Sequence, residues 1–448
     1  MNFYNLPKHL NINNMLELIG KYNKNCKVYN DDVECAALDT ICNILNIKEH
    51  ADVPIRIMPD VHNGKGITIG FSQPLTKTIN PLHIGVDIGC AVTCCITDGK
   101  INPNEYELIE YRTKKEIPFG FNINKKRAFD MKVFLKFMRS EFSKARSMCP
   151  ELVNDVEISE KYISNMLNRI GMNEGMFYKS LMSVGGGNHA IEFGEHNGCY
   201  TFMVHCGSRN FGVKVAKYWT KIASSNQVDN KLLKEAIKEL KKNVENKREL
   251  PQKIYELTEE FKSRSCSNGY LMGENMIGYL TDMVIAQAYA KFNHKLICDK
   301  IAEILYKING AKVIETIQSI HNYVSFDDKI IRKGAIKSYE GEKMIIPFNM
   351  RDGLAICVGK SNADWNYSAP HGAGRIMSRS KAKANISLEE FKESMKGIYT
   401  TSVCKNTIDE SPMAYKDTNV IIDHIKDTCD ILYMVKPIIN IKSTDEEN

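Results

Sequence analysis

Six short segments, spread over almost the whole chain, place polar or ionisable side chains among glycines and asparagines. Glycine is costly inside regular elements and is kept where the backbone turns sharply or approaches another group closely. Its repeated pairing with His, Asp and Cys predicts one site assembled from distant loops, which favours an enzyme. The segments are residues 60–70 (DVHNGKGITIG), 85–90 (GVDIGC), 185–192 (GGGNHAIE), 205–212 (HCGSRNFG), 321–322 (HN) and 371–375 (HGAGR).

Size and composition are those of a soluble globular protein. With 448 residues the chain can bury a large core, as one domain or as two fused ones. Apolar residues make up 43% of the chain and charged residues 25%, which are ordinary values. No apolar run approaches the roughly 18 residues of a membrane span. The first residues also lack the pattern of a secretory signal, so we expect a cytoplasmic protein without a membrane partner.

The cysteine usage and the net charge exclude some classes of protein. Fourteen cysteines without a secretory signal predict reduced thiols, and the lack of a C-x-x-C pair argues against a zinc ribbon. The net charge of +6 is compatible with a polyanionic partner, although it does not by itself indicate one.

The hydrophobic pattern predicts a mixed fold. From residue 53 onward, short apolar runs end in glycine turns, as is typical of buried strands whose ends carry loops. Residues 33–46, 126–148 and 157–170 have helical periodicity. Between about residues 214 and 308 the glycine loops stop, and a long helical stretch rich in Lys and Glu follows. We expect an α/β (α+β) fold in which one catalytic domain spans residues 1–448. Its β-rich core would carry a loop-borne metal site and a long helical insertion at 214–308; a separate helical domain is the alternative.

Five side chains are candidate metal ligands: Asp87, Cys90, His189, His205 and His321. Thiolate and imidazole together argue against magnesium or calcium alone, because these ions prefer oxygen ligands, and favour a transition metal. The set is sufficient for one ion or for two, since a thiolate can bridge a pair. Taken singly, the cysteine could be a packed core residue and the histidines ordinary loop residues. The five together, in glycine-bounded contexts, predict a metal site.

Other segments suit phosphate. The successive glycines at 185–187 offer backbone N–H groups that can form an anion nest, and the amide of Asn188 lies beside them. The guanidinium of Arg209 can make bidentate phosphate contacts. His371 has an arginine four residues on, at position 375. Its imidazole can attack phosphorus to form a phosphoramidate, or it can be a sixth metal ligand, and the spacing leaves both roles open.

Seven motifs in this order resemble the RtcB family of RNA-splicing and RNA-repair ligases: MPDVHNGKG, GVDIGC, GGGNHAIE, HCGSRNFG, IHN, SAPHGAGR and DESPMAYKD. The resemblance runs from about residue 50 to Lys442. It implies an RtcB-like fold and the use of GTP with manganese. Such enzymes join RNA ends bearing a 2′,3′-cyclic phosphate or 3′-phosphate to 5′-hydroxyl ends. A histidine takes GMP from GTP, the GMP passes to the RNA 3′-phosphate, and the 5′-hydroxyl displaces it.

The resemblance also implies a role for each matched residue. His371 would be the guanylylated histidine. Cys90 would bridge two Mn²⁺ ions, with Asp87 and His189 on one side and His205 and His321 on the other. The implied nucleotide-binding residues are Asn188, Glu192, Arg209, Asn322, Pro347, Asn349, Met350, Arg351, His371, Gly372, Ala373, Gly374, Arg375 and Lys442.

This chain departs from the family pattern at two places in the implied nucleotide pocket. Residues 347–352 (PFNMRD) replace a Gly-Ser-Met-Gly turn, and Ala369-Pro370 replaces Ser-Cys before the active histidine. The pattern is typical of a divergent bacterial-type subgroup. We expect an RNA ligase in tRNA splicing or RNA repair. Its partner would be cleaved RNA, such as tRNA halves, and an activating protein is a further possible partner. The alternatives are a dinuclear metal phosphoesterase acting on RNA ends and a ligation-deficient protein that binds or caps RNA ends.

Overall fold

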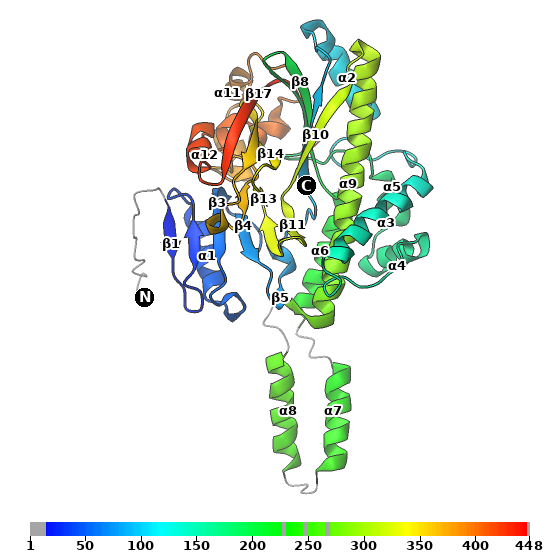
Figure 1. Cartoon of the computed structure of the whole chain (residues 1–448), viewed down its shortest axis with the longest axis vertical. Coiled ribbons are helices and arrows are strands. Elements are labelled where there is room, and N and C mark those ends of the chain that lie inside the picture. Colours follow the sequence, from blue (N-terminus) through cyan, green and yellow to red (C-terminus); the bar gives the residue numbers. More distant parts are fainter. Residues whose placement is uncertain (1–14, 226–229, 245–248, 265–268, 446–448) are drawn as a thin grey trace.

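Two β-sheets form the centre of the molecule, and helices flank them (Figure 1). The computed structural model describes residues 15–225, 230–244, 249–264 and 269–445. The remaining parts of the predicted 1–448 domain lie outside the described residues. The expected mixed α/β fold is confirmed, and its sheets are mainly antiparallel.

The larger sheet has seven strands and curls into a half-barrel. Every neighbouring pair in it is antiparallel. At the open seam, the backbone N–H of Ile345 donates to Ser319 Oγ at 2.9 Å, and Lys343 pairs with Glu315 at 2.6 Å. The first and last strands are therefore linked by side chains. The spatial order is β10 (Val313–Ile320), β6 (Ala91–Thr97), β8 (Cys199–Cys206), β7 (Ala190–His196), β17 (Cys429–Ile441), β15 (Gly353–Gly359) and β14 (Lys343–Asn349).

The smaller sheet has six strands, and only its β2–β3 pair is parallel. A single residue, His321, separates β10 of the larger sheet from β11 of the smaller one. The order is β1 (Leu16–Leu18), β2 (Cys26–Val28), β3 (Ile55–His62), β4 (Ile69–Pro74), β12 (Ile330–Lys333) and β11 (Asn322–Ser325). Two short pairs join β13 (Ala335–Lys337) to β16 (Ser368–Pro370), and β5 (Thr78–Ile79) to β9 (Leu271–Met272).

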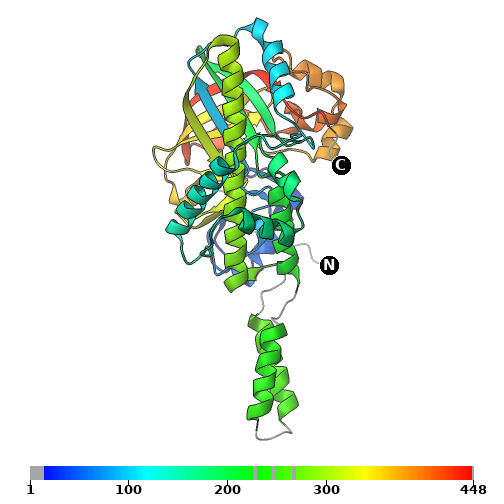
Figure 2. The same cartoon turned by 90° about the vertical axis from the view of Figure 1, so that its right-hand side faces the viewer.

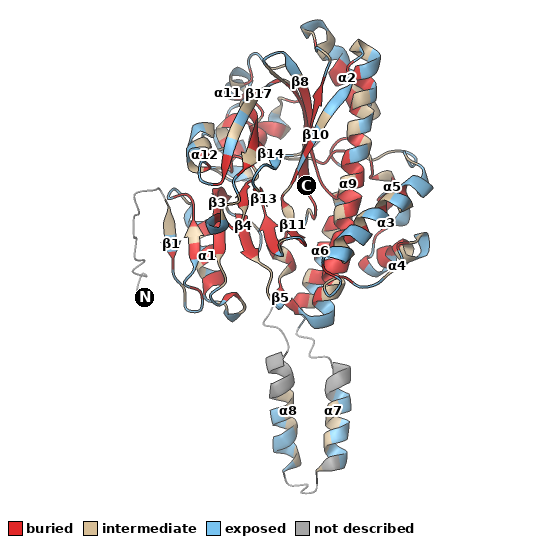
Figure 3. Ribbon diagram, in the orientation of Figure 1, coloured by how far each residue is buried: buried red, intermediate tan, exposed pale blue. Residues whose placement is uncertain are grey.

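One long helix, α9 (Gly273–Asn309), runs along both sheets (Figure 2). At 1.5 Å per residue its 37 residues extend over about 55 Å. It is buried along much of its length, as the red ribbon of Figure 3 shows. Tyr289 and Phe292 enter an aromatic cluster with Phe134 and Phe177. Among the described residues, no helix is long and apolar enough to span a membrane.

Two of the three predicted helices begin where a polar side chain caps them. Asp130 accepts N–H groups at the start of α3 (Met131–Met148), and Ser159 does so for α4 (Glu160–Ile170). The other helices are α1 (Cys35–Leu45), α2 (Tyr106–Glu116), α5 (Glu174–Lys179), α6 (Arg209–Ser224), α10 (Arg379–Asn385), α11 (Leu388–Ser394) and α12 (Thr418–His424). Short 3₁₀ turns include η2 (Pro81–His83) and η5 (Lys405–Glu410).

The predicted insertion, residues 214–308, contains two different kinds of helix. Helices α7 (Asn230–Asn243) and α8 (Leu250–Arg264) form a hairpin that projects from one end of the molecule (Figures 1 and 2). Its seam, with Ile237, Leu240 and Leu257, is only half-buried. By contrast, α6 and α9 pack on the core. The backbone N–H of Gly269 donates to Ala223 O at 3.0 Å, so the chain leaves and re-enters the body at adjacent points.

We propose that residues 226–268 form an insertion that the catalytic body does not need for folding. Replacing them with a short Gly-Ser linker should leave Tm within about 4 °C of the wild-type value. In a large domain a decrease of that size corresponds to a loss of about 1 kcal/mol of stability. Thermal melts monitored by circular dichroism test this. As a control, Tyr289→Ala in the buried part of α9 should lower stability by about 3–5 kcal/mol. A linker variant as unstable as Tyr289→Ala would contradict the proposal.

Candidate active site

The candidate active site lies at one edge of the seven-stranded sheet, where the ends of four strands meet. Cys90 directly precedes β6, His189 precedes β7, His205 is near the end of β8, and His321 follows β10. Antiparallel pairing sets Ala91 opposite both the end of β10 and the end of β8. The sheet register therefore gathers loops that are far apart in sequence.

Three ligand-type atoms converge at the centre of this edge. The Sγ atom of Cys90 lies 3.4 Å from Nε2 of His189 and 3.5 Å from Nε2 of His205. These three atoms are within 4.8 Å of one another. Asp87 Oδ2 is 3.1 Å from His189 Nε2. The ring centre of His321 lies 5.2 Å from that of His205, so the five predicted metal ligands form one cluster.

The loop carrying Asp87 is fixed by its neighbours. Asp87 Oδ1 accepts the backbone N–H of Ser208 at 3.0 Å. A Cβ atom at Gly207 would collide with the Asp87 carboxylate, which explains the glycine of the HCGSR segment. Burial opposes ionisation of Asp87, but the hydrogen bond and the charge of His189 outweigh it and lower its pKa to about 2. The carboxylate is therefore anionic at neutral pH.

The other members of the cluster are shifted mainly by burial. Burial, together with the neighbouring Asp87 carboxylate, raises the pKa of Cys90. Burial and the nearby histidines lower the pKa of His205 and His321, so both imidazoles are neutral at physiological pH. Neutral imidazole is the form that binds a metal ion.

The chemistry of these residues fits a divalent transition-metal ion. The Nδ1 atoms of His189 and His321 are buried and have no hydrogen-bond partner among the described residues. Buried polar atoms without partners are rare, and they often mark a place that an ion or a water occupies. A thiol, a carboxylate and three imidazoles supply a mixed donor set of the transition-metal type.

His371 stands at the end of this row of rings. Its ring centre is 4.7 Å from that of His321. Its Nδ1 lies 2.6 Å from Oδ2 of Asp60, and its backbone N–H donates to the same oxygen at 3.2 Å. Because an ionised carboxylate only accepts hydrogen bonds, the Nδ1 atom carries the proton. The Nε2 lone pair of His371 is therefore available to react.

Asp60 is a functional residue that the sequence analysis did not single out, although it begins the DVHNGKG segment. It is fully buried. The backbone of Gly374 has a φ of +75° and passes so close that a Cβ atom there would collide with the Asp60 backbone. The carbonyl oxygen of Asp60 also bonds Nδ1 of His62 at 2.9 Å. One residue thus holds both the HGAGR loop and a second imidazole.

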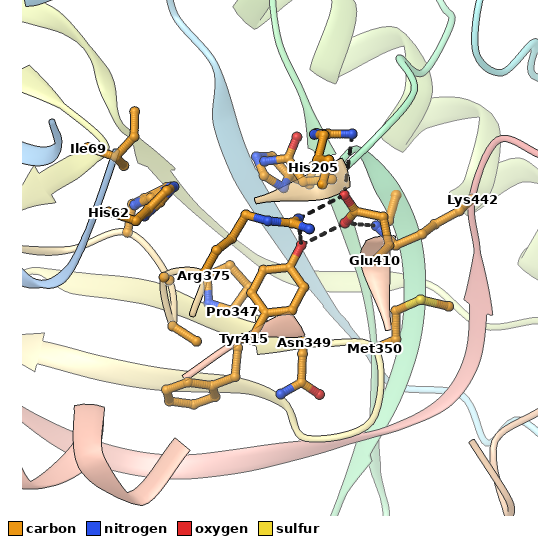
Figure 4. A pocket seen from close by; sticks show the side chains of 18 of the residues that line it. His62, Ile69, His205, Pro347, Asn349, Met350, Arg375, Glu410, Tyr415 and Lys442 are labelled. Atoms are coloured by element: carbon orange, nitrogen blue, oxygen red, sulfur yellow. Dashed lines mark hydrogen bonds and ion pairs between the residues drawn. The ribbon is translucent and has the colours of Figure 1, made fainter. Parts of the chain in front are cut away.

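A cavity of about 480 Å³ opens beside the cluster (Figure 4). Most of the predicted nucleotide-binding residues line it: Asn188, Glu192, Pro347, Asn349, Met350, His371, Gly372, Ala373, Gly374, Arg375 and Lys442. The metal-ligand candidate His205 also reaches it. Further lining residues that the sequence analysis did not single out include His62, Phe348, Glu410 and Tyr415. Glu410 and Tyr415 belong to the DESPMAYKD motif.

One wall of the cavity is organised around Glu410 (Figure 4). Its carboxylate contacts Lys442 Nζ at 3.3 Å, Arg375 Nη1 at 3.3 Å and the hydroxyl of Tyr415 at 2.7 Å. Burial opposes ionisation of Glu410, but Lys442 and two arginines outweigh it and lower its pKa to about 2. The wall therefore presents fixed cations held by one buried anion.

Glu192 differs from Glu410 in its charge state. It is buried, and this burial raises its pKa to about 8, although Asn440 donates to its Oε2 at 2.7 Å. Glu192 is therefore protonated at neutral pH and can donate a hydrogen bond to a ligand. Asn440 Oδ1 is buried and lacks a partner among the described residues, so it can accept one.

Three predicted nucleotide-binding residues do not line the cavity. Arg209 donates to Ser183 Oγ at 3.1 Å and to Gly120 O at 2.5 Å. Asn322 donates to the backbone carbonyl of Asp87 at 3.2 Å. Arg351 is half-exposed and pairs with its neighbour Asp352 at 2.7 Å. Their side chains hold loops in this structure.

The site combines a thiol and imidazole cluster, a cavity and a histidine bound to a carboxylate. This arrangement suits an enzyme that acts on phosphate groups. Comparison with known proteins identifies the family. The model of the tRNA-splicing ligase RtcB family matches residues 42–443. The chain therefore belongs to the RtcB family, and it is an RNA ligase of that family.

Individual relatives are distant but similar over most of their length. The RNA-splicing ligase RtcB of Escherichia coli K12 is 28% identical over 404 residues, covering 87% of this chain and 90% of the relative. The tRNA-splicing ligase RtcB of Aeropyrum pernix is 24% identical over 414 residues, covering 81% and 82%. The RNA-splicing ligase RtcB of Mycobacterium bovis is 21% identical over 431 residues, covering 82% and 91%.

The buried carboxylate of Glu410 should contribute acid-sensitive stability. Its pKa falls from 4.5 to about 2 on folding, so the contribution of about 3 kcal/mol is present above pH 4.5 and lost as the pH falls towards 2. Urea unfolding from pH 7 to pH 2 should therefore give a stability gap between wild type and Glu410→Gln that closes over this window. The exposed Asp423→Asn is the control, since an exposed ion pair contributes little to stability and its loss should give no such pH-dependent gap. A gap that does not change with pH would contradict the assignment.

Proposed function

We propose that this chain is a GTP- and manganese-dependent RNA ligase that works through a guanylylated histidine. It joins RNA ends bearing a 2′,3′-cyclic phosphate or a 3′-phosphate to 5′-hydroxyl ends. The observation that carries the proposal is the geometry of His371. Asp60 binds its Nδ1 at 2.6 Å, which leaves Nε2 free beside the cavity and next to the metal-ligand cluster.

In this proposal Cys90 would be shared by two Mn²⁺ ions, Asp87 and His189 would hold one of them, and His205 and His321 would hold the other. The close approach of the thiol and imidazole atoms supports this, as does the unpartnered Nδ1 of His321. Bound manganese would supply Lewis-acid stabilisation of charge on the reacting phosphates.

The first step would be attack of His371 Nε2 on the α-phosphorus of GTP. An N–P bond forms, the bond to the β-phosphate oxygen breaks, and pyrophosphate leaves. The ring then carries a positive charge, which the Asp60 carboxylate at Nδ1 offsets without movement. Backbone N–H groups of Gly372 to Gly374 are available beside the phosphates, because these residues line the same cavity.

The guanosine would lie against the far wall of the cavity. A protonated Glu192 and the anchored Lys442 offer hydrogen-bond donors there, and Asn440 offers an acceptor. Ala369 and Pro370, which replace Ser-Cys of the family, are buried in strand β16 and offer no side-chain donor. Base recognition would thus depend on Glu192, Asn440 and Lys442.

In the later steps GMP would pass from His371 to the RNA 3′-phosphate, giving an RNA-3′-pp-5′-G end. The 5′-hydroxyl then attacks the RNA phosphorus and GMP leaves, while a cyclic phosphate is first opened by hydrolysis. Asn188 lies next to His189 in sequence and lines the cavity, so it is suited to contact the RNA end. The physiological partner would be cleaved RNA, such as tRNA halves, in splicing or repair.

Incubation with labelled GTP and manganese tests the proposal. We expect a protein–GMP adduct that is acid-labile and alkali-stable, as a phosphoramidate is. His371→Ala should abolish it, and Asp60→Ala should slow its formation by about 10- to 100-fold, as for other partners that orient a histidine. His424→Ala serves as the control, because His424 does not line the cavity and its Nδ1 bonds the backbone carbonyl of Val420. No adduct in the wild type, or GTP-independent opening of a cyclic phosphate without joining, would instead favour a metal phosphoesterase.

A further inference from the structure

A second hollow, of about 500 Å³, lies beyond the central cavity. Three segments line it: the end of α2 at Lys114, Lys115 and Glu116, the loop that follows it through Lys125, and the segment after β17. Lys442 lines both hollows. We call the second one the strand groove. The groove therefore begins where the wall of the central cavity ends.

The loop at 118–125 is also connected to the metal-ligand cluster. The backbone N–H of Gly120 donates to Gly185 O at 3.3 Å, and that of Val184 donates to Pro118 O at 2.9 Å. Arg209 binds Gly120 O at 2.5 Å. A Cβ atom at Gly185 would collide with Nδ1 of His189. The loop thus reaches the cluster through a single intervening segment.

The strand groove has more cationic than anionic side chains that are available to a ligand. Lys115 and Lys125 line it and form no ion pair within the described residues, and Lys115 Nζ donates to the hydroxyl of Tyr111 at 3.4 Å. Its two carboxylates are already engaged, since Glu116 pairs with Arg112 at 2.7 Å and Asp445 accepts from Asn122 at 3.0 Å. The groove consequently suits a polyanion.

An exposed aromatic ring accompanies these cations. Phe121 lies between two groove-lining residues, Phe119 and Asn122, and is 66% exposed. Lys126 and Arg127, which directly follow Lys125, are exposed as well. A basic groove with an exposed aromatic side chain is the combination that holds single-stranded nucleic acid, because phosphates follow the cations and a base stacks on the ring.

We propose that the strand groove binds unpaired RNA flanking the end that reacts at the metal-ligand cluster, with Lys115 and Lys125 at its phosphates and Phe121 under a base. The inference rests on the proposed ligase function. An RNA end at the cluster must continue as a strand over the neighbouring surface, and the loop at 118–125 is the basic surface joined directly to Gly185.

Equilibrium binding of unpaired 12-nucleotide RNA tests the proposal without GTP. One RNA carries a 3′-phosphate and a blocked 5′ end, and the other carries a 5′-hydroxyl and a blocked 3′ end. Comparing the two RNAs identifies which of the two reacting strands the groove binds. For the strand that the groove holds, Phe121→Ala should weaken binding by about tenfold. The double variant Lys115→Ala/Lys125→Ala should reduce the slope of log K against log salt by about 1.4.

The matched controls are Lys24→Ala and Ile19→Ala, which remove an exposed lysine and a side chain that is 62% exposed. Neither should change the affinity or the salt slope. The proposal is overturned if the groove variants bind both RNAs within twofold of the wild type and with the same slope. Failure of the wild type to form a GMP adduct would refute the ligase function separately, because the binding measurement contains no GTP.

Discussion

The structure depends on the burial of a thiol and two imidazoles, with a third imidazole partly buried beside them, at one edge of a curled sheet. Burying polar groups is costly unless they gain partners, so this edge must either be compensated or remain strained. These buried polar groups lie at strand ends, where the register of the sheet brings Cys90 and His205 together. His321 is the single residue between β10 and β11, so a member of the cluster lies where the chain passes from one sheet to the other.

Two buried carboxylates at the site then have different tasks. Asp60 fixes the tautomer of His371, and Glu410 fixes Lys442 and Arg375. Because both are tied to rigid elements, the polar groups around the cavity are positioned before any ligand binds. Such preorganised charge is the main way in which proteins stabilise developing charge on phosphate. Glu192, kept protonated by burial, adds a donor where an ionised carboxylate could only accept.

The cluster was predictable from sequence because its signal is local: each histidine, Asp87 and Cys90 lies beside glycines or asparagines that mark a loop. Asp60 was missed as a partner of His371, which is 311 residues away, since no local pattern reports such a contact. Glu410 was missed for the same reason. The family resemblance placed Arg351 among the nucleotide-binding residues, but its neighbour Asp352 binds it. Helical periodicity likewise did not separate buried α9 from the projecting α7–α8 hairpin, because packing distinguishes them and local propensity does not.

Anomalous diffraction from crystals grown with Mn²⁺ tests the central claim most directly. The account predicts two anomalous peaks that share the sulfur of Cys90 as a ligand, and loss of both peaks in Cys90→Ala. The exposed Cys35→Ser should retain them, because that thiol lies outside the cluster. Peaks located away from Cys90, or manganese bound equally in Cys90→Ala, would contradict the account.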